Sequence, residues 1–188
     1  MLVMLTVVSA LILILGFRAD PEELFPDPSR LKKAYLFSFA ITGSVVALAI
    51  CVAGVPDNPP AAAKFIAANF GASLLLVSVN KRYFALKFFI PLAALLNGAV
   101  IALNNWRMPV FTHGDFGLEL AILGSPFHAV ATENTKLPWL ADYIESRFVF
   151  ENASASIGDV VMLLAIIYTA VQLSINLQKK SLAYPRYL

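Results

Sequence analysis

The chain has 188 residues, of which 59% are hydrophobic and 14% charged, with a mean hydropathy of +0.75 and a net charge of +2. Soluble domains carry about 25% charged residues, and so apolar a chain of this size cannot bury its hydrophobic side chains in one water-facing core. The composition excludes an ordinary soluble domain and predicts an integral membrane protein. The small net charge gives no sign of nucleic acid binding, and none is expected.

Five apolar segments are long enough, or nearly so, to cross a bilayer core, which needs about 20 helical residues. Their apolar residues are continuous instead of alternating, which favours helices over the strands of a barrel. We therefore expect an all-α integral membrane protein with five transmembrane helices in a single membrane domain spanning residues 1–188. The expected spans are residues 1–17, 34–55, 61–79, 84–103 and 158–177.

The distribution of lysine and arginine predicts the orientation of the spans. Segments 18–33, 80–87 and 178–188 would share one side of the membrane and hold most of the 14 positive residues. Positively charged short loops stay in the cytoplasm. The amino terminus is therefore expected outside and the carboxyl terminus inside, in a multi-pass protein of the cell (inner or plasma) membrane surrounded by lipid.

One long connection, residues 104–157, is expected on the outer side between the fourth and fifth spans. Loops of this length usually contain structure of their own. Two stretches have helical character, Asp115–Leu123 and Pro138–Phe150. The second places aromatic residues opposite charged ones, which is typical of a helix in the membrane interface. Packing against the ends of the spans is the alternative.

The stretch Ser156-Ile-Gly-Asp159 is a helix start signal at the beginning of the last span. A serine hydroxyl can accept from an early backbone N–H, and an aspartate in the first turn is favoured by the helix dipole. The same residues could instead mark a functional carboxylate at the membrane surface. We favour the helix cap.

Three polar residues are expected at the same depth in the membrane. The fourth span ends near Leu103 and the fifth begins near Gly158, so Asn104, Arg107 and Asp159 should lie at the same outer boundary. If these helices are neighbours, Arg107 can pair with Asp159 across them. We expect this pairing to join the helices.

Several amides are expected inside the membrane. Asn97 and Asn104 are seven residues apart and share one face of their helix. Polar side chains at this depth normally face the bundle interior, where interhelical hydrogen bonding is the favoured role and lining of a polar cavity the alternative. The other intramembrane amides are Asn69, Gln172 and Asn176.

Chemistry-bearing motifs are scarce. Cys51 is the single cysteine, and no phosphate-binding loop, nucleophile elbow or dinucleotide fingerprint is present. His113 and His128 are the only histidines and lack metal-ligand spacing, so no catalytic residue, metal or cofactor is expected. Ligation of haem, a pigment or a metal through His113 or His128 is the alternative.

Three stretches resemble a known family. They are N-x-x-R-M-P-V from Asn104, H-x6-T-x-L-x2-L-x-D from His128, and S-I-G-D-V from Ser156. They are similar to the motifs of bacterial membrane proteins catalogued as domain of unknown function 5317. The chain departs from that pattern at Asn105-Trp106, where the family has a glycine pair, and at Ala141, where it has glycine.

The resemblance implies a membrane layout and a set of candidate residues, but no activity. Together with the depth argument, it gives a polar cluster that would either join helices or bind a ligand. Its members are Asn97, Asn104, Arg107, His128, Asp142, Ser156 and Asp159.

Three classes of function fit these features. The favoured one is a non-catalytic accessory or assembly subunit of a larger membrane complex, whose partners are other membrane proteins. The second is a small-molecule transporter or ligand-binding membrane protein that uses the intramembrane amides. The third is a membrane-surface enzyme with Asp142 or Asp159 as acid or base and Arg107 holding an anion, and the lack of catalytic motifs weighs against it.

Overall fold

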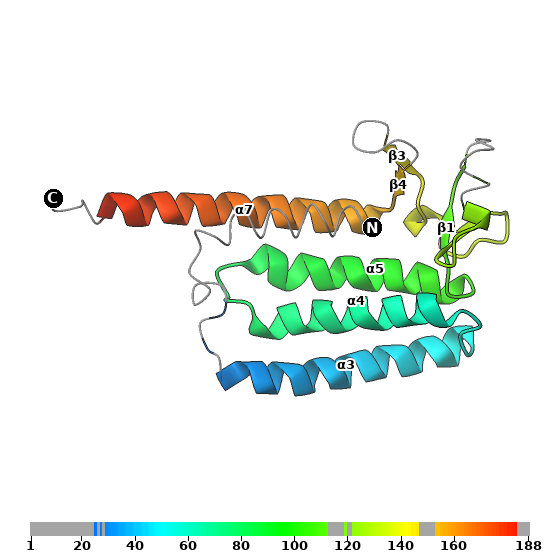
Figure 1. Ribbon diagram of the computed structural model, residues 1–188, viewed down its shortest axis with the longest axis horizontal. Coiled ribbons are helices and arrows are strands. Elements are labelled where there is room, and N and C mark those ends of the chain that lie inside the picture. Colours follow the sequence, from blue (N-terminus) through cyan, green and yellow to red (C-terminus); the bar gives the residue numbers. More distant parts are fainter. Residues whose placement is uncertain are drawn as a thin grey trace.

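The computed structural model describes residues 25, 27, 29–112, 119, 122–146 and 153–183. Its frame consists of four long helices that run in alternating directions, each packed against the next (Figure 1). They are α3 (Ser29–Ala53), α4 (Pro59–Ser78), α5 (Ile90–Leu103) and α7 (Ile157–Ala183). A π-helix, η1 (Ala85–Phe89), leads directly into α5. The predicted first span, residues 1–17, lies outside the described residues.

Four segments are long and apolar enough to cross a membrane: Ser29–Ala53, Pro59–Ser78, Ala85–Leu103 and Ile157–Asn176. They correspond to the second to fifth predicted spans and confirm helices of membrane-spanning length. The predicted all-α fold is wrong in one respect, because the described part of the chain is mostly helical but also contains four short strands. The helix contacts use small side chains. On α3, for example, the buried residues Ala34, Ser38 and Thr42 recur every four positions. Small side chains allow the close backbone approach on which membrane helix packing depends.

Local sequence signals end and begin α3 and α4. Gly54 follows α3 with a positive φ of 84°, and its N–H donates to the Ile50 carbonyl at 2.8 Å. Glycine adopts this left-handed conformation without steric cost. Asn58 then caps α4 by accepting from the Ala61 N–H at 3.3 Å, and Pro59 occupies the first helical turn, where no N–H is needed.

Pro91 accounts for the π-helix before α5. Proline has no N–H, so the carbonyl four residues earlier, on Lys87, loses its α-helical donor. The wider π turn over Ala85–Phe89 lets carbonyls reach donors one residue further along. The chain therefore crosses the proline without breaking the span.

A small module of strands and loops gathers at one end of the helices, where α3 and α5 end and α7 begins (Figure 1). Strand β1 (Met108–Val110) pairs in parallel with β2 (His128–Val130), and Asp142 bridges to Val110 on its other side. Strand β3 (Ile144–Ser146) pairs antiparallel with β4 (Ala153–Ala155). We call the described residues 104–112, 122–146 and 153–156 the loop module.

The prediction of a helix over Pro138–Phe150 is wrong for its described part. Pro138–Leu140 forms a 3-10 helix, η2, and the chain then continues as strand β3. The backbone of Asp142 is held extended because its N–H donates to Pro109 and its carbonyl accepts from Phe111, both at 2.9 Å. Strand pairing therefore overrides the amphipathic pattern. The other predicted loop helix, residues 115–123, lies mostly outside the described residues.

Candidate functional site

The start of α7 is built as the sequence predicts. Ser156 is the capping residue, and its Oγ accepts from the Asp159 N–H at 3.1 Å. In return, the Ser156 N–H donates to Asp159 Oδ2 at 3.1 Å. This reciprocal arrangement is a capping box with aspartate in place of the usual glutamate. The prediction of a helix cap at Ser156–Asp159 is confirmed.

Asn97 of α5 joins this cap from the neighbouring helix. Its Nδ2 donates to Asp159 Oδ1 at 3.2 Å, and its Oδ1 lies 2.9 Å from the Ser156 hydroxyl. That hydroxyl also lies 2.9 Å from Asp159 Oδ2, and because it has one hydrogen it donates to one of the two oxygens at a time. We call Asn97, Ser156 and Asp159 the anchor triad.

Gly158 lets the two helices approach closely enough for these bonds. A Cβ at this position would lie 2.1 Å from Asn97 Oδ1 and 3.1 Å from the Ala93 carbonyl oxygen. A side chain there requires Asn97 to leave its position or α7 to move away from α5. Each letter of S-I-G-D except the isoleucine therefore has a structural role: Ser156 caps, Gly158 permits contact, and Asp159 bonds to both Ser156 and Asn97.

Asn104, at the end of α5, forms a second junction, between that helix and the loop around Lys136. Its Nδ2 donates to the carbonyls of Val100 at 2.7 Å and Lys136 at 2.9 Å, while its Oδ1 accepts from the Lys136 N–H at 2.8 Å. The side chain thus pairs with the loop backbone as a strand residue would. Asn104 holds the loop around Lys136 against the end of α5.

The predicted pairing of Arg107 with Asp159 is wrong. The Arg107 side chain is exposed, and no ion pair or hydrogen bond of its guanidinium is found among the described residues. Asp159 is occupied by Asn97 and Ser156 instead. Equal depth in the membrane does not determine where a side chain points. The chain makes a left-handed turn at Asn105 and Trp106, and this turn changes the direction of the backbone just before Arg107.

From its position in the sequence Trp106 would suit an anchor at the membrane interface, but the structure buries it. Asn105 and Trp106 have φ angles of 54° and 58°, a conformation that costs an ordinary residue about 1–2 kcal/mol. Trp106 is only 2% exposed, meets the edge of the Phe65 ring at 5.2 Å and donates from Nε1 to the Gly54 carbonyl at 3.3 Å. Its burial and these two contacts offset the strain of the left-handed backbone.

Asp142 and His128 lie in the loop module. Asp142 is 6% exposed, and its Oδ1 has no hydrogen-bond partner among the described residues. Burial, together with the nearby charge of Asp159, raises the pKa of the Asp142 carboxyl to about 8. The sequence indicates Asp142 as a candidate residue but not its isolation inside the module.

His128 is half-buried beside Ser125. The Ser125 hydroxyl accepts from the Phe127 N–H and lies 2.9 Å from His128 Nδ1, so its own hydrogen can donate to the ring. Burial and then the charge of Lys64 lower the pKa of His128, which favours a neutral imidazole with Nδ1 as acceptor. The sequence does not indicate a role for Lys64, whose Nζ lies 4.2 Å from the centre of the Phe127 ring.

The intramembrane amides do not gather in one place. Asn69 donates to the Phe65 carbonyl of its own helix at 2.9 Å, and Gln172 donates to the Tyr168 hydroxyl at 3.1 Å. Asn176 has a buried Nδ2 without a partner among the described residues. The described part of the structure therefore shows no polar cavity lined jointly by Asn69, Gln172 and Asn176.

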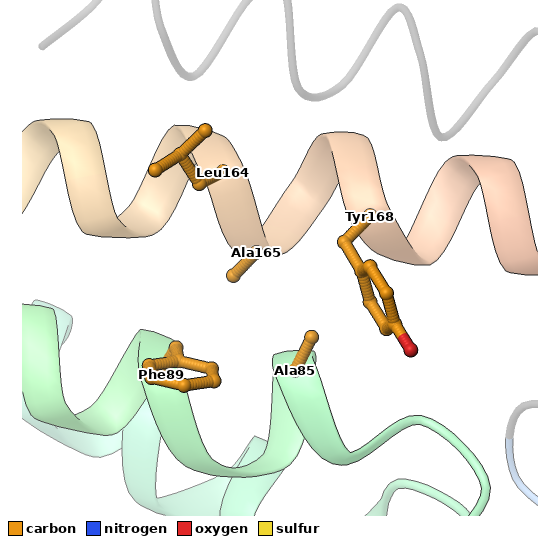
Figure 2. Close-up of a pocket in the computed structure, with 5 residues that line it drawn as sticks. All are labelled: Ala85, Phe89, Leu164, Ala165 and Tyr168. Carbon is orange, nitrogen blue, oxygen red and sulfur yellow. The ribbon is translucent and has the colours of Figure 1, made fainter.

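A pocket of about 250 Å³ lies between the start of the η1–α5 helix and α7 (Figure 2). It is apolar apart from the tyrosine hydroxyl, and none of the predicted site residues lines it. The lining residues are Ala85, Phe89, Leu164, Ala165 and Tyr168. In the described part of the chain no group of three or more histidine, cysteine or acidic side chains has metal-binding geometry, and His113 lies outside that part.

The fold and the anchor triad define a helical protein of the membrane-spanning type, with a polar junction at one end of the bundle. The model of a family described as "Family of unknown function (DUF5317)" matches residues 29–171, and the chain belongs to that family. All three resembling motifs fall inside the matched segment, so the resemblance is confirmed. No curated protein and no solved structure matches the chain.

Proposed function

We propose that this chain is a non-catalytic subunit that helps to assemble or hold a larger complex in the cell membrane. The main support for this proposal is that the polar motif residues form hydrogen bonds within the protein. Asn97, Ser156 and Asp159 satisfy one another across two helices, and Asn104 satisfies a loop backbone. Groups engaged in this way position helices and loops, and they leave little free for substrate chemistry.

Two competing functions receive less support. A transporter would need convergent polar side chains, whereas Asn69 and Gln172 bond within their own helices. An enzyme using Arg107 with Asp142 or Asp159 would need the carboxylate beside the guanidinium. Arg107 is exposed instead, while Asp142 is buried and Asp159 is bonded to Asn97. Neither arrangement resembles a site prepared for a reacting molecule.

The loop module also offers a surface for a partner. Large apolar side chains outside the four long helices are exposed there or at the helix connection beside it: Leu123 is 75%, Trp139 62% and Val55 82% exposed. Exposed apolar residues on a polar rim are typical of surfaces that contact another protein or the lipid interface. With Arg107 also exposed, this end of the bundle has both an apolar and a cationic component.

The proposal includes five transmembrane spans, with residues 1–17 as the first, the amino terminus outside and the carboxyl terminus in the cytoplasm. The distribution of lysine and arginine supports this orientation. It places the loop module on the outer side, where partners with extracytoplasmic segments can reach it. Cysteine labelling of an Asn134→Cys variant in a Cys51→Ser background tests it: labelling by a membrane-impermeant reagent on intact cells is expected.

Native mass spectrometry after extraction in mild detergent tests the proposed role. We expect this chain to be recovered with at least one other membrane protein, and a Leu123→Ser/Trp139→Ser variant to retain its fold but lose that protein. A Phe39→Ser variant, altered on the exposed face of α3, is the matched control for a loss of apolar surface. Recovery of the unaltered chain alone, in several detergents, would overturn the proposal.

A further inference from the structure

Asp142 is a buried acidic residue of the loop module. Neither the anchor triad nor the contacts within the module account for the burial of its carboxyl group. Its side chain is 6% exposed and Oδ1 lacks a partner among the described residues. Its backbone cannot turn away freely, because its N–H and carbonyl are bonded to Pro109 and Phe111. The preceding Ala141 is fully buried. The carboxyl is thus held inside the module without a donor at Oδ1.

Two charged groups among the described residues act on this carboxyl from the surrounding elements. Asp159 approaches it from the start of α7 and disfavours its ionised form, while Lys64 of α4 favours that form. His128 of β2 lies in the same electrostatic neighbourhood, since Lys64 and Asp159 act on it too. Burial adds to the effect of Asp159, and together they outweigh Lys64.

We propose that Asp142 is a proton-binding site, and that loss of its proton loosens the attachment of the loop module to the start of α7. The protonated acid is neutral and can remain buried at moderate cost. The ionised form would be a buried anion with an unsatisfied oxygen, repelled by Asp159. Water can reach the ionised oxygen only if the side chain or the residues packed around it move. The 3-10 helix η2 lies just before Asp142 and contacts α7, so this movement loosens the module where it meets that helix.

The direction of the pH dependence follows from the two protonation equilibria. The pKa of Asp142 is about 8 in the folded chain, against an ordinary value of 3.8. Between these values the folded state binds more protons than the unfolded state, so stability falls as pH rises. The contribution of Asp142 is therefore greatest below pH 4, declines up to about pH 8, and is constant above it.

Two measurements on the full chain in detergent or nanodiscs test the proposal. Infrared difference spectra are expected to show a protonated carboxyl band that titrates near pH 8 and is absent in Asp142→Asn. The midpoint of thermal unfolding should fall between pH 5 and pH 8 in the unaltered chain, and this slope should flatten in Asp142→Asn. Glu133→Gln, an exposed position in the same module, is the matched control and should keep the slope.

A second variant keeps the proposal testable if Asp142→Asn does not fold. Asp159→Asn removes the carboxylate that opposes ionisation of Asp142, so the infrared titration should shift to lower pH. An Asp142 carboxyl that is already ionised at pH 6, or an unchanged titration in Asp159→Asn, would overturn the proposal. Neither result bears on the proposed role as a complex subunit, which the native mass measurement tests separately.

Discussion

Gly158→Ala is expected to destabilise the folded chain by about 2–4 kcal/mol, because overpacking of a fitted contact costs about 1–3 kcal/mol and the anchor triad is disturbed as well. The added Cβ would lie 2.1 Å from Asn97 Oδ1 and 2.7 Å from Asn97 Cγ. Thermal or denaturant unfolding in detergent measures the effect. A larger side chain, as in Gly158→Leu, should prevent recovery of folded protein.

Gly71→Ala is the matched control for this substitution. Gly71 also lies within a helix, but a Cβ there meets no atom within 4 Å. It should be neutral or stabilise by up to about 1 kcal/mol, since alanine is the better helix former. A Gly158→Ala/Asn97→Ala double variant should lose less than the sum of its parts, because the clashing side chain is gone. If Gly158→Ala were as mild as Gly71→Ala, the close approach of α5 and α7 would be wrong.

Trp106→Ala should have the other large effect. Removing a buried tryptophan typically costs about 3–5 kcal/mol. Here it also removes the edge contact with Phe65 and the hydrogen bond to Gly54, while the left-handed backbone at positions 105 and 106 remains to be stabilised. The free energy of unfolding, followed by circular dichroism in detergent, measures the loss.

The chain supplies its own control, because it has two tryptophans with opposite exposure. Trp139 is 62% exposed, whereas Trp106 is 2% exposed. Trp139→Ala should change the free energy of unfolding by no more than about 0.5 kcal/mol, as is usual for surface positions. Comparable losses for the two variants would contradict the packing role assigned to Trp106.

The helical frame could be predicted from the sequence because hydropathy and helix end signals are local. The expected spans 34–55, 61–79 and 84–103 differ by only a few residues from the observed helices at most of their ends. The cap of α7 was predictable for the same reason: Ser156 and Asp159 are three residues apart and bond to each other. Such signals do not depend on the remainder of the fold.

The candidate site could be predicted only in part, because its decisive contacts join residues far apart in the chain. Asn97 and Asp159 are 62 residues apart, and nothing local indicates that Gly158 makes room for their bond. Depth in the membrane suggested Arg107 as the partner of Asp159, but depth does not determine the direction of a side chain. The turn through Asn105 and Trp106 determines that direction. A left-handed tryptophan is uncommon, so the sequence does not predict this turn.

The strand pairs of the loop module were beyond prediction for a related reason. Each strand has three residues, too few for a periodic pattern, and β1 is stabilised by a strand well separated from it in sequence. The aromatic and charged residues of 138–150 fit a helical pattern equally well. The bonds of Asp142 to Pro109 and Phe111 and the pairing of β3 with β4 decide the outcome.

The claim on which this account rests is that Asn97, Ser156 and Asp159 join α5 to α7. A double-mutant cycle on the free energy of unfolding, using Asn97→Ala and Asp159→Ala, tests it most directly. Residues that share a hydrogen-bonded network show coupling of about 0.5–3 kcal/mol, and we expect about 1–2 kcal/mol here. Losses that add to within about 0.3 kcal/mol would show that the two residues act independently, and would contradict the anchor triad.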